Sequence, residues 1–583
     1  MKLTSSQKAA VEHLGNLSLV SCPGSGKTRT LISKLLDILP ETTRTTRLAC
    51  CITYTNAAVQ EIEVRLRNLG ISSNGDYEVD TIHTFCLKHI LRPFSWKLEP
   101  FPSGFTLVSS DDPTFQTIAQ KIIKRHNLNG RAVEDFGNLL RGTGIFPDSI
   151  TDIAAKEFWK ELDTRSMIDL NGIIYWSSLL VSTHSHIARG LASRYKFLVI
   201  DEFQDTTKMQ VDILRAIHKF DRTIFFFVGD PHQSIMSGFG ARPELMNTFA
   251  REVNARVDVQ LFENFRSSRS ILSLADQICP REKAMVPAGE ASDVIDHPQW
   301  FTVLSMEDGI LEHFLPIIKK HHIPLSEVAI LANRWTSLIP VARAMRQHQV
   351  PIIGPGSRPY KRSGLLARLL EEVGARVSEK SINGLGPVRR ELQALLNTIN
   401  SHPPTPEFSF DVAIIKALIG ARTIAQSESI ATKFIPAFVE HLSNVLISSD
   451  LISPFSVPIL QSACTQMVTE INKYEVDHNT RVTTIGDLGM FARGSNSIRL
   501  LTMHGSKGRE FDAVAIIDFF DGHVPFYKAK IGDEIEAEGR RLFYVAATRA
   551  RKVLQIFTLQ SPTYKTQPSR FLKDVFPKGP DSF

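Results

Sequence analysis

The sequence predicts an α/β protein with two domains, each built on a parallel β-sheet and each interrupted by a mostly helical insertion. Two observations support this fold class. Short apolar runs alternate with amphipathic helical patterns in both halves of the chain, and in each half a long helical stretch separates two groups of strand-like runs. At 583 residues the chain is also too long to fold around a single hydrophobic core.

The first group of elements begins near the N-terminus with a helical pattern and a short apolar strand. A second strand and a second helix follow, so strands and helices alternate as they do in parallel sheets. The elements in chain order are a helix over Ser5–Leu14, a strand over Leu17–Ser21, a helix over Arg29–Leu39, a strand over Leu48–Thr53 and a helix over Asn56–Leu69.

The strand signal then fades, and helical patterns such as Phe115–His126 and Ala154–Asp163 take its place. Apolar strands return at Tyr195–Thr206 and Thr223–Val228. The helical stretch therefore interrupts one sheet domain. We predict a first sheet domain over 1–90 and 188–258, with a helical insertion over 91–187.

The second half repeats this organisation. An apolar run lies within Glu327–Trp335, a mostly helical stretch follows, and strand signals return at Ile498–His504, Phe511–Phe520 and Val553–Leu559. We predict a second sheet domain over 259–370 and 495–583, with a short helical insertion over 371–494.

Composition limits the classes of protein that this chain can belong to. The chain is 43% hydrophobic and 22% charged, which is typical of globular proteins. Its net charge of +6 permits a polyanionic partner without demonstrating one. The N-terminus carries no apolar signal core, and no apolar run reaches the roughly 18 residues of a membrane helix. We expect a soluble, cytoplasmic protein with no membrane partner.

The cysteines do not form a metal-binding pattern. None of the six makes a CxxC pair or has the spacing of a zinc site, and the spacings do not suggest four thiolates around an iron–sulfur cluster. We therefore predict neither a zinc site nor an iron–sulfur cluster. Buried thiols in a reducing compartment explain the cysteines, which are Cys22, Cys50, Cys51, Cys86, Cys279 and Cys464.

A phosphate-binding loop is the strongest local signal. LSLVSCPGSGKTRTL (Leu17–Leu31) is an apolar strand, a glycine-containing turn and a helix. Such glycines let backbone N–H groups surround phosphate oxygens at a helix N-terminus. Lys27 is expected to reach the β- and γ-phosphates of ATP, and Thr28 to bind Mg²⁺. The pattern GxxxxGK(S/T) fails only at its first glycine, where Ser21 is small enough to make the turn.

The phosphate loop needs an acidic partner on a neighbouring strand, and FLVIDEFQDT (Phe197–Thr206) supplies one. Asp201 follows four apolar residues and is expected to hold the metal ion. Glu202 is placed to polarise an attacking water. With the loop residues Ser21, Cys22, Pro23, Gly24, Ser25, Gly26, Lys27 and Thr28, these carboxylates predict hydrolysis of a nucleoside triphosphate.

The chain resembles the UvrD/Rep/PcrA-like superfamily 1 DNA helicases through eight motifs in family order. They extend over nearly the whole chain, which makes a chance match improbable. The motifs are LTSSQKAAV (Leu3–Val11), TYTNAAVQEI (Thr53–Ile62), TIHTFC (Thr81–Cys86), VIDEFQDT (Val199–Thr206), GDPHQSI (Gly229–Ile235), LFENFRSS (Leu261–Ser268), IRLLTMHGSKGREFDAVAI (Ile498–Ile516) and EGRRLFYVAATRARKVL (Glu538–Leu554).

The resemblance implies two RecA-like P-loop NTPase domains that use ATP and Mg²⁺. It assigns Gln7 to the adenine edge, Phe265 to adenine stacking and Glu510 to the ribose, and it makes Arg29 a nucleotide contact by analogy. Gln233 is expected to sense the γ-phosphate. Arg266 and Arg549 match the family's arginines, which stabilise charge on the transferred phosphoryl group.

The resemblance also implies a track for single-stranded nucleic acid, which needs aromatic platforms and polar contacts to the backbone. Tyr54 and Asn56 belong to its first segment, His83 to the next, and Thr502 and His504 to the second half. The implied partner is single-stranded or 3′-tailed DNA, with movement in the 3′→5′ direction. That DNA is preferred to RNA rests on the resemblance, and His83 has a second interpretation as a core histidine.

The chain departs from the family pattern after Gln233. The family has aromatic residues there that stack on bases, whereas this chain has Met236 and Gly238 at those positions and Phe239 one residue later. Two interpretations of Phe239 stay open, a shifted base-stacking platform and a core residue.

Two functions follow from the sequence. The first is an ATP-dependent DNA helicase or translocase that unwinds duplex DNA. The second insertion is short beside the family's typical one, which keeps an alternative open. In that alternative the chain is a nucleic-acid-stimulated ATPase that serves a partner nuclease in repair or phage defence and unwinds little by itself.

Overall fold

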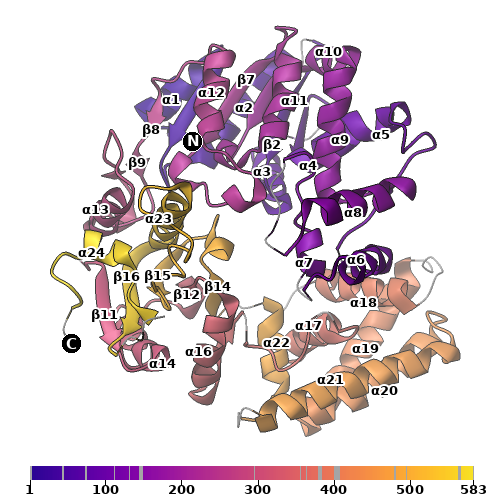
Figure 1. The fold of residues 1–583 in the computed structure, drawn as a ribbon. Helices are drawn as coiled ribbons and strands as arrows, with labels where there is room; N and C mark the ends of the chain where they lie inside the picture. Colours follow the sequence, from indigo (N-terminus) through magenta and orange to yellow (C-terminus); the bar gives the residue numbers. More distant parts are fainter. Residues whose placement is uncertain are drawn as a thin grey trace. The chain divides into compact units, whose positions relative to one another are not determined.

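The computed structural model divides the chain into two compact units. The first consists of Met1–Asp293 with Ala537–Tyr544, and the second of Val294–Glu536 with Val545–Phe583. Helix α23 (Glu534–Ala547) contributes to both (Figure 1). The structure describes residues 3–42, 45–71, 75–110, 112–129, 132–143, 147, 149–294, 296–354, 356–362, 364–378, 384–399, 407–477, 481–493, 496–561, 563 and 566–581.

The first unit contains a six-stranded parallel sheet in the order β3-β2-β6-β7-β1-β8. Non-consecutive neighbours such as β2 and β6 show that a long segment leaves the sheet and returns to it. The strands are β1 (Leu17–Ser21), β2 (Leu48–Thr53), β3 (Tyr77–Thr81), β6 (Tyr195–Ile200), β7 (Ile224–Gly229) and β8 (Gln260–Leu261).

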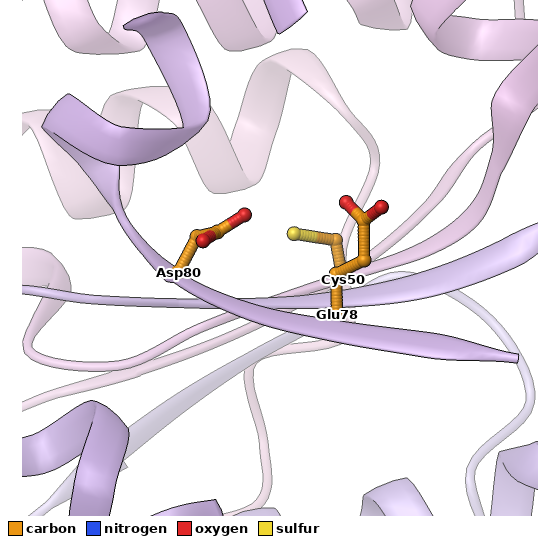
Figure 2. Close-up of side chains that lie close together, drawn as sticks. All are labelled: Cys50, Glu78 and Asp80. Atoms are coloured by element: carbon orange, nitrogen blue, oxygen red, sulfur yellow. The ribbon is translucent and has the colours of Figure 1, made fainter. Parts of the chain in front are cut away.

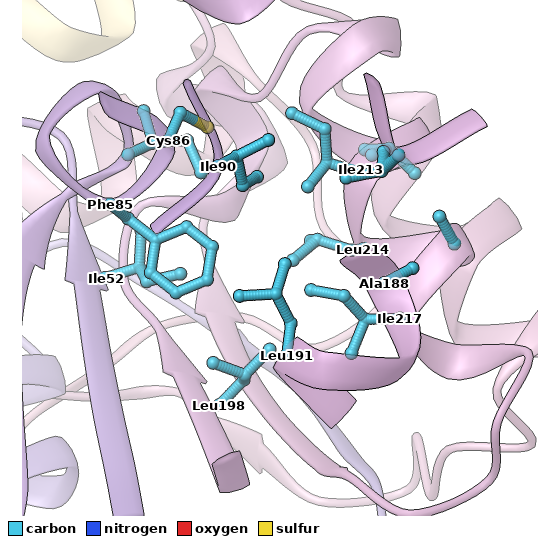
Figure 3. Close-up of a cluster of buried hydrophobic side chains, with 14 of the residues drawn as sticks. Ile52, Phe85, Cys86, Ile90, Ala188, Leu191, Leu198, Ile213, Leu214 and Ile217 are labelled. Atoms are coloured by element: carbon cyan, nitrogen blue, oxygen red, sulfur yellow. The ribbon is translucent and has the colours of Figure 1, made fainter. Parts of the chain in front are cut away.

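Helices cover both faces of this sheet, so its central strands are apolar on both sides. On β2, Ala49 and Cys51 enter one apolar cluster and Cys50 and Ile52 enter another. The first face carries α1 (Ser5–Glu12), α2 (Lys27–Thr42) and α3 (Asn56–Asn68). The second carries α4 (Ile82–Cys86), α9 (Leu170–Thr183), α10 (Ser185–Arg194), α11 (Lys208–His218) and α12 (Glu244–Glu252), and Figure 3 shows part of its core.

The first insertion has a small core of its own. Its helices are α6 (Pro113–His126), α7 (Ala132–Phe136) and α8 (Asp152–Thr164), and Phe115, Phe136 and Phe158 pack together between them. Asp112 caps α6 by accepting from the backbone N–H of Thr114 at 2.8 Å. Helix α9 lies within the predicted limits of the insertion, but its apolar residues pack in the core of the sheet.

The second unit contains another six-stranded parallel sheet, in the order β11-β16-β15-β12-β14-β13. Its central strand β12 is buried along its whole length, as expected for a strand covered on both faces. The strands are β11 (Gln299–Val303), β12 (Val328–Ala332), β13 (Ile352–Ile353), β14 (Ile498–Thr502), β15 (Phe511–Ile516) and β16 (Ala550–Leu559).

The second insertion is helical and has a separate apolar core. Its helices are α17 (Ala367–Ser378), α18 (Gly386–Ile399), α19 (Glu407–Ser427), α20 (Ala431–Ser448), α21 (Val457–Asp477) and α22 (Ile485–Arg493). Helices α17 and α22 cross at two glycines, Gly374 and Gly489. A Cβ on Gly374 would lie only 2.9 Å from the backbone nitrogen of Gly489. Small residues at this crossing let the two backbones approach closely.

Two parallel sheets with helical insertions confirm the predicted fold class. Strand β8 adds a sixth strand to the first sheet, and the first compact unit continues to Asp293. The division into four domains, with a boundary between the halves at residue 258, stays a prediction. In the described part of the chain, no helix is both long and apolar enough to cross a membrane.

Candidate nucleotide and nucleic-acid site

The phosphate loop joins the end of β1 to the first residue of α2, Lys27. Gly24 and Gly26 have φ angles of +63° and +78°, which glycine adopts far more easily than other residues. A Cβ on Gly24 would lie 2.5 Å from the Cβ of Arg266, and one on Gly26 would lie 2.7 Å from Nε2 of Gln7. Conformation therefore favours glycine at both positions, and the contact with the Cβ of Arg266 also leaves no space for a side chain at Gly24.

Ser21 occupies the place of the missing first glycine and is buried. Its hydroxyl donates to the backbone carbonyl of Gly229 at 3.0 Å, which links β1 to the end of β7. The hydroxyl of Ser25 donates to the carbonyl of Cys22 at 2.8 Å and closes the loop. The serine at position 21 is thus compatible with a phosphate loop and adds a tie to the neighbouring strand.

Lys27 carries a buried ammonium group at the N-terminus of α2. Within the described residues its Nζ makes no hydrogen bond, and it lies 3.7 Å from Oε1 of Glu202. A buried ammonium at a helix N-terminus favours an anion, and a triphosphate supplies oxygens that Lys27 can bind. Thr28 follows in the first helical turn, and Arg29 is exposed beside it.

Two carboxylates end strand β6. Asp201 is buried and accepts a hydrogen bond from the backbone N–H of Glu202 at 2.9 Å. Burial and the neighbouring charge of Glu202 raise the pKa of Asp201 to about 7, although Lys27 acts in the opposite direction. A bound cation would stabilise the charged carboxylate. Oxygen ligands from Asp201 and Thr28 suit Mg²⁺, so the residues present fit this ion.

Glu202 has a φ of +51°, an uncommon conformation for a residue other than glycine. Gln204, which the sequence did not single out, fixes the position of its carboxylate. The side-chain amide of Gln204 donates to Oε2 of Glu202 at 2.5 Å, and its oxygen accepts from the backbone N–H of Asp230 at 3.0 Å. Gln204 is fully buried and connects the acidic segment to the end of β7.

Gln233 follows β7 in a short 3-10 turn and is buried. Its side-chain nitrogen donates to Oδ2 of Asp230 at 2.8 Å. Burial alone would raise the pKa of Asp230, but the nearby positive charges of Arg281 and Lys27 lower it below its ordinary value. Asp230 is therefore a charged anchor for the side chain of Gln233.

Gln7 lies against the phosphate loop. It forms a capping box with Thr4 at the start of α1, and its Nε2 donates to the backbone carbonyl of Ser25 at 2.9 Å. The side chain is fully buried. The expected contact with adenine stays a prediction, while the structure shows that Gln7 joins α1 to the loop.

The segment after β8 packs on the phosphate loop. Asn264 is fully buried, donates to the carbonyl of Pro23 and accepts from the backbone N–H of Arg266 at 2.8 Å. The backbone N–H of Phe265 donates to the carbonyl of Gly24 at 2.9 Å, and the residue is 36% exposed. The structure thus places Phe265 and Arg266 beside the loop. Asn264 was missed, although it stands in the same motif as both.

Tyr54 and His83 line one cavity of about 400 Å³ between the first sheet domain and its insertion. Gly137, Asn138 and residues 140–143 of the insertion form part of its wall, and the exposed cations Lys208 and Arg242 contribute positive charge. Burial lowers the pKa of His83, which keeps the imidazole neutral near pH 7. Asn56 is exposed at the first position of α3, whose cap is Thr55.

The side chain of Phe239 lies outside the described residues, so both interpretations of it stay open. Four other predicted residues belong to the second unit. Thr502 ends β14, while His504 and Glu510 are exposed in the segment that leads to β15. Arg549 is fully buried, and its guanidinium donates to the carbonyls of Val545 at 2.8 Å and Arg509 at 3.0 Å.

One group of potential metal ligands lies away from the phosphate loop. Cys50 on β2 and Glu78 and Asp80 on the neighbouring strand β3 point towards one another (Figure 2). Glu78 already accepts from the hydroxyl of Tyr195 at 2.7 Å, from Arg194 at 2.8 Å and lies 2.9 Å from Nε2 of His89. These partners satisfy the carboxylate of Glu78 without a metal, so we interpret the group as a structural polar network.

Comparison with known proteins gave two matching family models. The model described as UvrD/REP helicase N-terminal domain matches residues 3–143 and 144–254, and the UvrD-like helicase C-terminal domain matches residues 480–561.

Among curated proteins, the chain is 23% identical to ATP-dependent DNA helicase PcrA of Leuconostoc citreum, over 97% of this chain and 83% of that protein. It is 24% identical to DNA helicase II of Rickettsia typhi, over 98% of this chain and 95% of that protein. It is 22% identical to ATP-dependent DNA helicase Rep of Buchnera aphidicola, over 98% and 94%.

Proposed function

The chain belongs to the UvrD-like helicase family, and we propose that it is an ATP-dependent DNA helicase or translocase. In this proposal ATP hydrolysis drives 3′→5′ movement on single-stranded DNA and separates duplex strands. The curated relatives are named ATP-dependent DNA helicases or DNA helicase II, which supports the reaction class. Direction and unwinding are carried over from the family resemblance.

The proposal rests on four side chains that lie together in the first unit, those of Lys27, Asp201, Glu202 and Gln233. Lys27 lies 3.7 Å from Glu202, Asp201 precedes Glu202, and Gln204 links Glu202 to the turn that holds Gln233. Bound Mg²⁺ would neutralise phosphate charge, and Thr28 and Asp201 would hold it. Lys27 binds the terminal phosphates, Glu202 accepts a proton from the attacking water, and Gln233 senses the terminal phosphate.

Arg266 and Arg549 are proposed to stabilise the charge that develops on the transferred phosphoryl group. Arg266 follows Phe265, whose backbone is hydrogen-bonded to Gly24 of the loop. Gln7, Phe265, Arg29 and Glu510 are proposed to bind the base and sugar of ATP. Each of these roles needs the nucleotide-bound protein for its test.

The cavity that contains Tyr54 and His83 is the proposed part of the strand track in the first unit. An exposed aromatic ring provides a surface for a base, and Lys208 and Arg242 suit the phosphate backbone. Asn56, Phe239, Thr502 and His504 are proposed to contact the same strand.

The alternative function is a nucleic-acid-stimulated ATPase that serves a partner nuclease and unwinds little. The second insertion, which is short beside the family's typical one, favours this alternative. The matched relatives give no support to a role in phage defence.

Two assays test these functions. ATP turnover is measured with single-stranded DNA, duplex DNA and RNA, using Lys27→Ala as the inactive control. Strand displacement is then measured on duplexes with a 3′ or a 5′ tail. We expect stimulation by single-stranded DNA and displacement from the 3′ tail only. Strong stimulation without displacement on either substrate would support the alternative, and no stimulation by any nucleic acid would contradict both functions.

A further inference from the structure

Arg281 is a buried charged residue that the proposed mechanism does not use. It follows helix α13 (Arg269–Ile278), and only 10% of its side chain is exposed. Its Nη2 donates to Oδ1 of Asp230 at 2.7 Å and to the hydroxyl of Tyr544. Asp230 and Tyr544 are both fully buried. A buried arginine shared by two buried polar groups restricts the positions of both.

The carboxylate of Asp230 transmits this restriction to Gln233. Its Oδ1 accepts from Arg281 and from the backbone N–H of His232 at 3.1 Å, while its Oδ2 accepts from Nε2 of Gln233 at 2.8 Å. Because both oxygens are engaged, rotation of the carboxylate breaks hydrogen bonds on both sides. The orientation of the Gln233 amide therefore depends on Arg281 through a single carboxylate.

The same guanidinium also contacts helix α23 and the strand before the phosphate loop. Tyr544 of α23 accepts from Arg281, donates to the sulfur of Met285 at 3.8 Å and has its ring centroid 5.9 Å from that of His232. Nη1 of Arg281 lies 3.5 Å from the carbonyl oxygen of Ser21. These residues all belong to the first unit.

We propose that Arg281 is a positioning residue for ATP hydrolysis, which orients Gln233 through Asp230 and joins Tyr544 of α23 to the same carboxylate. The proposal rests on the proposed function, in which Gln233 senses the terminal phosphate. Arg281 itself touches neither nucleotide nor water in this role. Its loss leaves Asp230 buried without its hydrogen-bonded cation, so the carboxylate that accepts from the Gln233 amide is less firmly oriented.

A double-mutant cycle tests the proposal. DNA-stimulated ATP turnover is measured for Arg281→Ala, Gln233→Ala and the double variant, with kcat and KM for ATP determined separately. We expect Arg281→Ala to lower kcat by about 10- to 100-fold, the range seen when a supporting residue is removed, with KM nearly unchanged. If Arg281 acts through Gln233, the double variant turns over no more slowly than Gln233→Ala alone.

Arg358→Ala is the matched control, because Arg358 also pairs with a buried carboxylate, Glu371 of α17, at 2.7 Å but belongs to the second unit. It is expected to combine additively with Gln233→Ala. Should Arg281→Ala fail to fold, Arg281→Lys and Tyr544→Phe take its place. Lysine keeps the charge without the fork that reaches both partners, and phenylalanine removes only the hydroxyl.

The outcomes separate this inference from the proposed function. If Gln233→Ala keeps full turnover, the sensing role of Gln233 in the proposed function is wrong. A slow Gln233→Ala variant leaves the proposed function standing. The positioning role of Arg281 is then overturned if the Arg281 variants lower kcat additively with Gln233→Ala, or if they change only KM.

Discussion

At the scale of single residues, the backbone conformation of Glu202 places its carboxylate beside the phosphate loop. Glu202 adopts a φ of +51° while its carboxylate lies 3.7 Å from Lys27 and accepts from Gln204. Strained backbone of this kind persists where the surrounding structure fixes it. The strain aims Glu202 at the ammonium of Lys27, next to the carboxylate expected to hold Mg²⁺.

Replacing Glu202 with glutamine tests its role in activating water. Glutamine keeps the size of the side chain and one acceptor oxygen but does not accept a proton, so hydrolysis is expected to fall by about 100-fold or more. Binding of ATP is expected to stay intact because Lys27 and the loop are unchanged. Turnover by phosphate release and binding by a fluorescent ATP analogue check this, and near-normal turnover would contradict the role.

Replacing Gly24 with alanine tests the close packing of the loop. The new Cβ would lie 2.5 Å from that of Arg266 at a φ of +63°, so we expect a loss of roughly 1–3 kcal/mol in unfolding free energy and a large loss of ATP affinity. Gly190→Ala is the control, because nothing lies within 4 Å of its Cβ position in α10. Equal melting temperatures and ATP affinities for both variants would refute the packing argument.

At the scale of elements, the ends of parallel strands gather the predicted residues. Strands β1, β6 and β7 are neighbours in the order β6-β7-β1, and their carboxyl ends lead to Ser21, Asp201 and Asp230. The sequence located these strands closely, since Leu17–Ser21 and Leu48–Thr53 match β1 and β2 residue for residue. Their order in the sheet depends on long-range pairing, which local patterns do not contain.

The edge strand β3 carries a polar network whose stability depends on pH. Burial disfavours charge on Glu78, but hydrogen bonds from His89, Tyr195 and Arg194 bring its pKa well below the ordinary value of 4.5. Burial also disfavours charge on His89, whereas its hydrogen bonds to Asp80 and Glu78 raise its pKa above 6.5. The contribution of Glu78 is therefore lost as the pH falls below about 4.5, and that of His89 as the pH rises above about 6.5.

We expect Glu78→Gln to destabilise the first unit most between about pH 5 and 6, where both groups are charged in the folded protein. The difference in unfolding free energy between the Glu78→Gln variant and the wild-type protein should shrink at lower and at higher pH than this. Urea unfolding across a pH series measures it, with the exposed Glu99→Gln as control. A difference that does not vary with pH would show that packing alone explains the loss.

At the scale of the whole molecule, the predicted site residues fall in both compact units. The first unit holds the phosphate loop, the acidic segment, Gln233, Phe265 and Arg266, and the second holds Thr502, His504, Glu510 and Arg549. Arg549 is anchored in the second unit by hydrogen bonds to the carbonyls of Val545 and Arg509. Its action on the phosphoryl group belongs to the proposed function.

Arg549→Ala is expected to lower kcat for ATP by about 100-fold or more and to change KM little, because a transition-state contact affects turnover more than binding. Arg549→Lys tests whether charge alone suffices. Thermal unfolding of both variants shows whether the loss of the buried guanidinium also destabilises the second unit. A rise in KM with unchanged kcat would place Arg549 in ground-state binding instead.

The sequence by itself determined the fold class, the phosphate loop and the family, because strand and helix periods, glycine positions and ordered motifs are local properties. Only the tertiary structure revealed Asn264, Gln204 and Arg281 as the residues that connect the loop, the acidic segment and Gln233. It also assigned β8 to the first sheet. These features depend on contacts between residues far apart in the chain, where a buried polar side chain carries no local signal of its partner.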